Sequence, residues 1–186
     1  MNSFSCVITG HRPTRFKFKY NEKDKRCQRI KKCLQEQLIR LYNQGVRCFW
    51  AGGAMGADMW ASEILLRMKE QTAYQDVELC LALPFEGYDA DWDDWHRKRM
   101  KFIRKYAAKV LILGEMPSSE NYKKRNCFME RFWRRCRNSM NGNARYFWPE
   151  RWRKKILRLW EQSLDCPIKG QRRFTTGRFR KSERVL

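Results

Sequence analysis

The stretch GGAMGAD, residues 52–58, decides the fold because it joins two segments of different periodicity. Val46 to Ala51, just before it, is a short apolar run typical of a buried strand. The segment after it has apolar residues at helical spacing, namely Met59, Ile64, Leu65 and Met68. Glycines let a backbone turn tightly beside a ligand, and a following helix turns N–H groups toward an anion. The stretch therefore predicts either a phosphate-binding loop or a plain tight turn, and it matches neither the GxGxxG fingerprint nor the P-loop.

The same alternation continues on both sides of this stretch. Further strands are predicted at residues 4–9, 77–83 and 109–113, and further helices at about 27–41, with Gly45 as C-cap, and at 91–106. Strands separated by helices are typical of a parallel sheet covered on both faces. Residues 1–130 are therefore predicted to form an α/β domain, a Rossmann-like three-layer parallel sheet.

Candidate site residues follow the predicted strands, whose carboxyl ends share one edge of such a sheet. His11 and Arg12, in TGHRP (residues 9–13), offer a proton donor and a phosphate clamp, or they belong to a surface turn. Asp58 and Glu63 are candidate catalytic bases, although Asp58 also suits a helix N-terminus. Trp60 and Phe85 can stack on a base or lie in the core. The acidic cluster at residues 89–94 is interpreted as helix-start charge.

The composition excludes several other classes of protein. The eight cysteines form no CxxC pair and only two histidines are present, so reduced structural cysteines are expected, with no metal site and no cofactor. Neither a transmembrane helix nor a signal peptide is indicated, so a cytoplasmic protein without membrane association is expected.

The positive charge is concentrated in the last third of the chain. Residues 131–186 carry 17 Lys and Arg against 4 Asp and Glu, whereas residues 1–130 carry 24 against 16. Residues 131–186 form a basic extension rich in Trp and Arg, with one short helix predicted at about 150–164 and a disordered tail from Lys169.

Four motifs together resemble one known family. TGHRP (9–13), GGAMGADMWASE (52–63), PFEGYDADW (84–92) and YKKRNCFM (122–129) look like the successive motifs of the YpsA-like branch of the SLOG superfamily, relatives of the LOG and DprA/Smf Rossmann-like domains. The resemblance covers residues 4 to about 129. It implies a Rossmann-like fold and a nucleotide or nucleotide-derived ligand at the strand ends.

The resemblance also implies which residues contact that ligand. By position in the family motifs they are Gly10, His11, Arg12, Gly52, Gly53, Ala54, Gly56, Asp58, Trp60, Glu63, Pro84, Phe85, Arg125 and Asn126. A definite reaction cannot be carried over, because the PGGxGTxxE motif of LOG phosphoribohydrolases has no match in this sequence.

The chain departs from the family pattern after Met129. The family continues with an apolar strand and a GGT-type glycine motif, whereas this chain continues ERFWRRC (130–136). Two explanations are open: a lineage-specific basic extension, or a shift of reading frame near residue 130. Translation of the other two frames of the gene distinguishes them.

Three functional hypotheses follow. The first is a domain that senses or processes a nucleotide-type small molecule. The second is a DprA-like protein that binds single-stranded nucleic acid through residues 131–186. The third is a domain that no longer binds a ligand well, because its four-stranded sheet lacks the last strand and exposes an edge. A partner, or self-association into a homo-oligomer, would then cover that edge.

Overall fold

The computed structural model describes residues 4–139, with side chains up to Phe132. It contains four strands, β1 (Phe4–Ile8), β2 (Val46–Ala51), β3 (Glu78–Leu83) and β4 (Lys109–Ile112). The α-helices among these residues are α1 (Lys25–Asn43), α2 (Ala57–Lys69), α3 (Asp94–Tyr106) and α4 (Ser119–Ser139). Two short 3₁₀ turns, η1 (Pro13–Arg15) and η2 (Thr72–Tyr74), lie in the connections.

The four strands form one parallel sheet in the order β1-β2-β3-β4. Ile8 pairs with Ala51, and Ala51 pairs with Leu81, so the strands end together. The segments that follow β1, β2 and β3 are therefore brought to one edge of the sheet.

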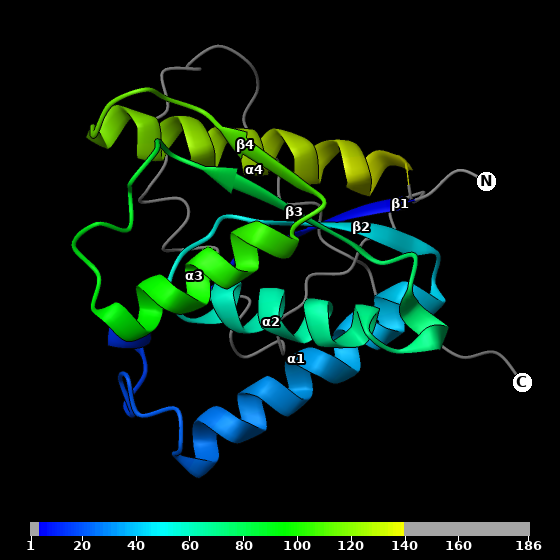
Figure 1. The fold of residues 1–186 in the computed structure, drawn as a ribbon. Coiled ribbons are helices and arrows are strands. Elements are labelled where there is room, and N and C mark those ends of the chain that lie inside the picture. The colour runs from blue at the N-terminus through cyan, green and yellow to red at the C-terminus, as the bar shows by residue number, and fades with distance from the viewer. Residues whose placement is uncertain (1–3, 140–186) are drawn as a thin grey trace, which may run out of the picture. The chain divides into compact units, whose positions relative to one another are not determined.

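Helices cover both faces of this sheet (Figure 1). Helices α1, α2 and α3 lie on one face, and α4 lies on the other, where it packs against β1 and β3. Right-handed crossovers that move the same way across a sheet keep their helices on the same face, which explains the first layer. The predicted three-layer, Rossmann-like α/β fold is confirmed.

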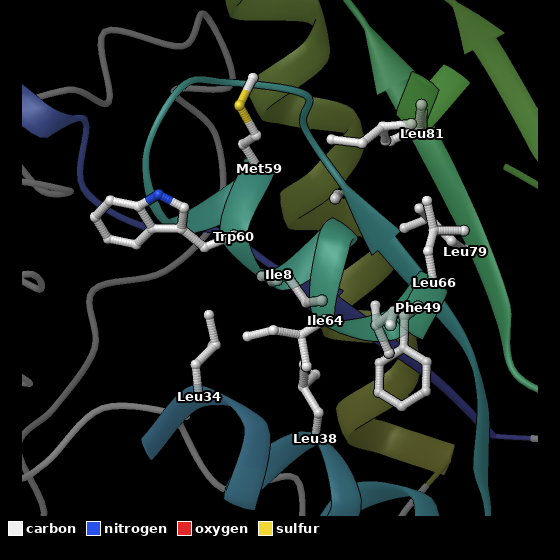
Figure 2. Packing of buried hydrophobic residues seen from close by; sticks show 14 of the residues in the cluster. Ile8, Leu34, Leu38, Phe49, Met59, Trp60, Ile64, Leu66, Leu79 and Leu81 are labelled. Atoms are coloured by element: carbon white, nitrogen blue, oxygen red, sulfur yellow. The ribbon is translucent and has the colours of Figure 1, made fainter. Parts of the chain in front are cut away.

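The main core lies between the sheet and the layer of α1, α2 and α3. Phe49, Leu79 and Leu81 of the strands belong to one buried cluster with Leu38 of α1 and Leu65 of α2, all of them almost fully buried. Figure 2 shows part of this cluster. Helix α2 is buried on most of its surface because it runs between the sheet and its two neighbouring helices. A smaller cluster under α4 contains Trp50, Cys80, Ala82 and Met129.

The predicted element boundaries agree closely with the structure. Helix α1 ends at Asn43, and Gly45 follows with a φ of 93°, a C-terminal role that suits glycine. Helix α3 begins at Asp94, three residues later than predicted, because Asp93 caps it by accepting the backbone N–H of His96 at 3.1 Å. The interpretation of the acidic cluster as helix-start charge is therefore confirmed for these two aspartates.

The structure describes only the beginning of the basic extension, residues 131–139. Helix α4 continues through residue 130 to Ser139. The predicted helix at 150–164 and the tail from Lys169 lie outside the described residues.

Candidate functional site

The loop after β2 takes a conformation that requires glycine at position 53. Gly53 has a φ of 66°, and a Cβ atom there would lie 2.6 Å from Leu83 Cδ2 and 2.7 Å from Tyr88 Oη. The buried Tyr88 hydroxyl donates a hydrogen bond to the Gly53 carbonyl oxygen at 2.7 Å. The loop is thus pressed against the end of β3 and the segment after it.

Gly56 brings the loop after β1 onto the start of α2. It is the N-cap of α2 with a φ of 96°, and a Cβ atom there would lie 2.5 Å from the His11 carbonyl oxygen. The same oxygen accepts the backbone N–H of Ala57 at 3.3 Å. The structure therefore brings His11 and the glycine loop together, as predicted from their strand ends. The His11 ring lies edge-on to Phe16.

Asp58, in the first turn of α2, holds these two loops together. Its buried carboxylate accepts the backbone N–H of Gly52 at 3.2 Å and also those of Ala54 and Gly10. Burial raises the pKa of Asp58 to about 6, although Arg125 and these three N–H groups act in the opposite direction. Because its partners are backbone N–H groups of the loops after β1 and β2, this carboxylate fixes the positions of both loops.

Arg125 reaches the same loop from α4, on the other face of the sheet. Its guanidinium donates a hydrogen bond to the Gly52 carbonyl oxygen, and its Nε donates to Asn126 Oδ1 at 3.0 Å. Burial lowers the pKa of Arg125, and repulsion from the Arg12 guanidinium lowers it further, whereas Asp58 raises it. Arg12 is solvent-exposed. Arg12 lies between His11 and Pro13, which both lie against Gly56, so two arginines from distant parts of the sequence lie beside this glycine loop.

Pro84 and Phe85, at the end of β3, are buried. Phe85 packs edge-on against Tyr122 of α4, with ring centroids 5.5 Å apart. Phe85 was expected either to stack on a base or to lie in the core, and the structure places it in the core.

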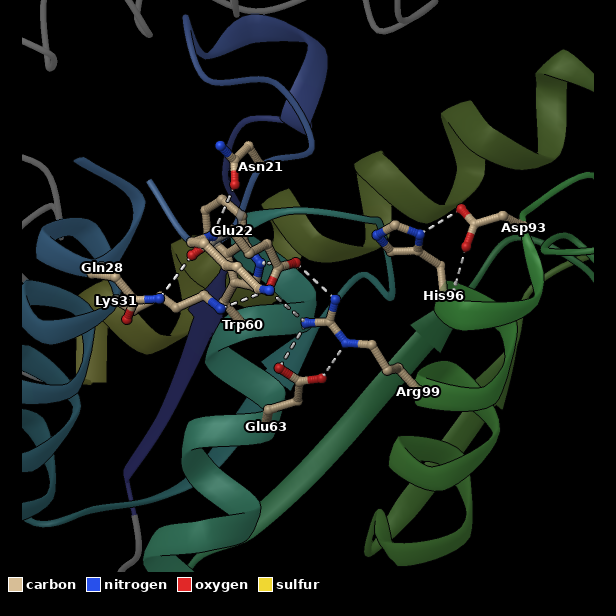
Figure 3. A network of polar contacts seen from close by, with 10 residues as sticks. Asn21, Glu22, Gln28, Lys31, Trp60, Glu63, Asp93, His96 and Arg99 are labelled. Carbon is tan, nitrogen blue, oxygen red and sulfur yellow. Dashed lines mark hydrogen bonds and ion pairs between the residues drawn. The ribbon is translucent and has the colours of Figure 1, made fainter. Parts of the chain in front are cut away.

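Trp60 also lies in the core. It is 1% exposed, and its ring packs against Phe16 and Phe18 of the segment after β1. Its Nε1 donates a hydrogen bond to Glu22 Oε1 at 2.8 Å (Figure 3). Trp60 therefore anchors that segment to α2, and its ring is not open to a ligand.

Glu63 takes part in a network of charged side chains (Figure 3). Arg99 of α3 donates to both Glu63 oxygens, at 2.6 and 2.8 Å, and to Glu22 at 2.7 Å. Lys31 donates to the other Glu22 oxygen at 2.6 Å. Burial opposes ionisation of Glu22, but hydrogen bonds from Arg99, Lys31 and Trp60 outweigh it and lower its pKa to about 2.

Sequence reasoning missed Glu22 and Arg99. They are 77 positions apart, and each lies in a stretch where charged residues are common, so no local signal marks them. Trp60 holds Glu22 against α2, and the packing of α3 beside α2 then brings Arg99 to it.

A second unforeseen pair is Cys48 and Cys80, on neighbouring strands beneath α4. Their Sγ atoms are 3.5 Å apart, and Cys48 is only half-buried. The hydrogen bond with Cys80 is the main reason that the pKa of Cys48 is lowered to about 7, whereas the pKa of Cys80 is raised. Sequence reasoning treated both as small apolar residues.

Metal-binding clusters and membrane-spanning helices are both absent from the part of the chain that the structure describes. Among the side chains that the structure describes, up to Phe132, no group of three or more His, Cys, Asp or Glu residues is arranged to hold a metal ion. Between residues 4 and 139, no helix is both long and apolar enough to cross a membrane.

The parallel sheet, the glycine loop at its carboxyl edge and the helix that starts there define a Rossmann-like α/β domain. A family model described as the YspA SLOG family matches residues 6–131. The chain belongs to this family, as its four motifs predicted.

Known relatives agree with this assignment. The chain is 30% identical to the UPF0398 protein of Oenococcus oeni over 117 residues. These residues make up 62% of this chain and 58% of the relative. It is 29% identical over 125 residues to the UPF0398 protein of Bacillus cereus, with 66% of each covered. The UPF0398 protein YpsA of Bacillus subtilis is 24% identical over 124 residues, 66% of this chain and 67% of the relative. The chain thus spans about 58% to 66% of the length of the first two relatives.

Proposed function

We propose that this domain binds an anionic small molecule of the nucleotide type at the carboxyl edge of β1, β2 and β3. The observation that carries the proposal is the approach of Arg12 and Arg125 to the glycine loop. Two like charges held near each other raise the free energy of the empty site, and an anion between them lowers it. Phosphate groups are the anions that guanidinium pairs and glycine loops bind most readily in proteins.

Three further features support this choice of ligand. Gly56 starts α2 without a capping side chain, so the positive end of the helix dipole faces the same edge. Gly10 and His11 lie on the other side of the loop, and the Asp58 carboxylate fixes both segments by backbone hydrogen bonds. A site whose backbone is already fixed loses little entropy on binding.

The proposal concerns binding, and it assigns no reaction. Asp58 is occupied by backbone N–H groups and Glu63 by Arg99, so neither carboxylate faces the glycine loop as an unengaged base. Trp60 and Phe85 are buried and take no part in the proposed contacts. Contacts to the nucleobase of the ligand must therefore come from half-buried or exposed groups around the glycine loop.

The experiment is a thermal unfolding assay of the full chain with a panel of nucleoside mono-, di- and triphosphates and dinucleotides. A ligand present at 100 times its Kd stabilises the native state by about 2.7 kcal/mol, which raises Tm by several degrees. We expect Arg12→Ala to abolish this rise. Arg15→Ala removes an exposed arginine of the same segment and is the matched control. A panel with no Tm change, or equal changes for wild type and Arg12→Ala, contradicts the proposal.

Binding of single-stranded nucleic acid through residues 131–186 is a second candidate, and the 17 basic against 4 acidic residues there favour it. Affinity of the full chain for oligothymidylate is then expected to fall steeply with salt and to vanish when residues 131–186 are deleted. Binding that survives this truncation argues against it.

A further inference from the structure

A groove of about 420 Å³ runs between α2 and α3, away from the glycine loop. Each helix lines it with four residues at the spacing i, i+3, i+4 and i+7, which are Glu63, Leu66, Arg67 and Glu70 from α2 and Trp95, Lys98, Arg99 and Phe102 from α3. Residues at this spacing share one face of a helix over two turns, or about 10 Å. The groove therefore follows both helices lengthwise.

The groove exposes an unusual amount of aromatic surface. Trp95 is 66% exposed and Phe102 is 51% exposed, and Tyr106, one turn beyond Phe102, is 49% exposed. The Phe102 and Tyr106 rings lie 4.7 Å apart, so they form one continuous apolar row on α3. Leu66, which is buried, faces this row from α2. Contiguous apolar surface of this kind on a folded domain marks a site of interaction.

The charges beside the apolar row are mostly positive. Arg99 is neutralised by Glu63 and Glu22, whereas Arg67 and Lys98 form no ion pair with any side chain that the structure describes. Helix α3 as a whole carries six basic residues and one acidic residue. Glu70 contributes an opposing charge at one end of the groove. An occupant that pairs with Arg67 and Lys98 must carry carboxylates or other anions.

The positive charge of the chain argues against two occupants of the groove, namely a second copy of the chain and residues 131–186 of the same chain. The whole chain has a formal net charge of +21, so a second copy would bring further positive charge to a positive rim. The stretch 131–186 of the same chain is the most basic part and fits no better. The occupant is therefore a different, acidic molecule.

The shape and lining of the groove favour a polypeptide over a nucleic acid. Arg67 and Lys98 are the two basic residues of the lining without an ion pair to a described side chain, whereas a nucleic-acid surface makes roughly six to ten phosphate contacts. A channel of two helical turns between parallel rows of i, i+3, i+4 and i+7 residues fits the apolar face of a helix. We propose that the α2–α3 groove docks an acidic amphipathic helix of a partner protein, with its apolar side chains against Leu66, Trp95 and Phe102 and its carboxylates near Arg67 and Lys98.

The test uses a fluorescein-labelled peptide of Leu, Glu and Ala, roughly 18 residues long because shorter helices are marginal in water. Leu stands at i, i+3, i+4 and i+7, and Glu flanks these positions. Fluorescence anisotropy with the full chain gives Kd. We expect Trp95→Ala, Phe102→Ala and Lys98→Glu each to raise Kd about tenfold, as substitutions at central contacts do.

Matched variants control for general effects. Met116→Ala removes an apolar side chain that is 71% exposed outside the groove, and Lys101→Glu reverses a charge on α3 that does not line it. Both are expected to leave Kd within about twofold, since surface changes outside a contact have small effects. Circular dichroism checks that every variant is folded, and Lys98→Glu is an exposed change that leaves the core untouched.

Several outcomes would overturn the proposal. One is equal Kd values for the groove variants and their controls. Another is equal binding of a peptide with Lys in place of every Glu, which would show that the positive rim is irrelevant. A third is displacement of the peptide by oligothymidylate whose own affinity falls in the groove variants, which would make the groove a nucleic-acid surface.

Discussion

Asp58 Oδ2 accepts the backbone N–H of Gly52 at 3.2 Å, although the carboxyl group is buried and its pKa is raised to about 6. One residue at the start of α2 thus binds the loop that leads into that helix. The raised pKa gives this carboxyl group a definite effect on stability. A native-state pKa above the unfolded value of 3.8 means that folding becomes less favourable as pH rises from 3.8 through 6.

The first prediction concerns Asp58→Asn. Between pH 4 and pH 7 the wild-type chain is expected to lose about 2.4 kcal/mol of unfolding free energy that the variant does not lose, because a shift of one pKa unit corresponds to about 1.4 kcal/mol and part of the effect falls below pH 4. Urea unfolding of both chains at four pH values measures this difference. Parallel curves for the two chains would show that the carboxyl group titrates normally.

The second prediction concerns Glu22, whose pKa is shifted in the opposite direction. A native-state pKa of about 2 stabilises the fold above the ordinary value of 4.5, and this contribution disappears as pH falls through 2. Glu22→Gln is expected to cost roughly 2–3 kcal/mol at pH 7 and almost nothing near pH 2. Glu36→Gln, an exposed change on α1, is the control and should have little effect at either pH.

A third prediction separates two costs of replacing a glycine. Gly53 and Gly87 both have positive φ angles, of 66° and 72°, but only Gly53 lies against other atoms. Gly87→Ala is expected to cost about 1 kcal/mol of unfolding free energy for its backbone conformation. Gly53→Ala should cost about 1–3 kcal/mol more because its Cβ atom meets Leu83 and Tyr88. Equal values from denaturant unfolding would mean that the loop moves freely away from β3.

The fourth prediction concerns the Cys48 thiol. Because Cys80 lowers the pKa of Cys48 to about 7, iodoacetamide should alkylate Cys48 with a rate that rises around neutral pH. In Cys80→Ala the midpoint of this rise is expected near the ordinary value of about 8.5. Peptide mass spectrometry follows the rate at Cys48, and Cys33→Ala, on the exposed side of α1, should leave it unchanged. An unaltered midpoint in Cys80→Ala would remove Cys80 as the cause.

Local pattern was sufficient to predict the four strands and the first three helices. Val46–Ala51 is a short apolar run bounded by glycines on both sides, which is typical of a buried strand. The spacing of residues such as Leu34 and Leu38 leaves one buried helix face. Gly53 and Gly56 could be identified as turn residues because their positive φ angles suit glycine. These features depend on residues close together in the sequence.

The contacts of the site residues could not be predicted in the same way. Trp60 was compatible with either stacking on a ligand or packing in the core, and only the position of Phe16 and Phe18 decides between the two. The same holds for Glu63, which meets Arg99 because α3 lies beside α2. Helix α4, which carries Arg125, was not among the helices predicted from periodicity. Its place on the opposite face of the sheet depends on tertiary structure.

The strand order β1-β2-β3-β4 also has a consequence for the growing chain. Each strand pairs with the strand synthesised just before it, so the sheet can extend in the order in which the ribosome makes it. Arg125 is then the last part of the candidate site to be made, since it belongs to α4. A nascent chain that has emerged only as far as β4 would already hold the glycine loop, but it would lack the second guanidinium group.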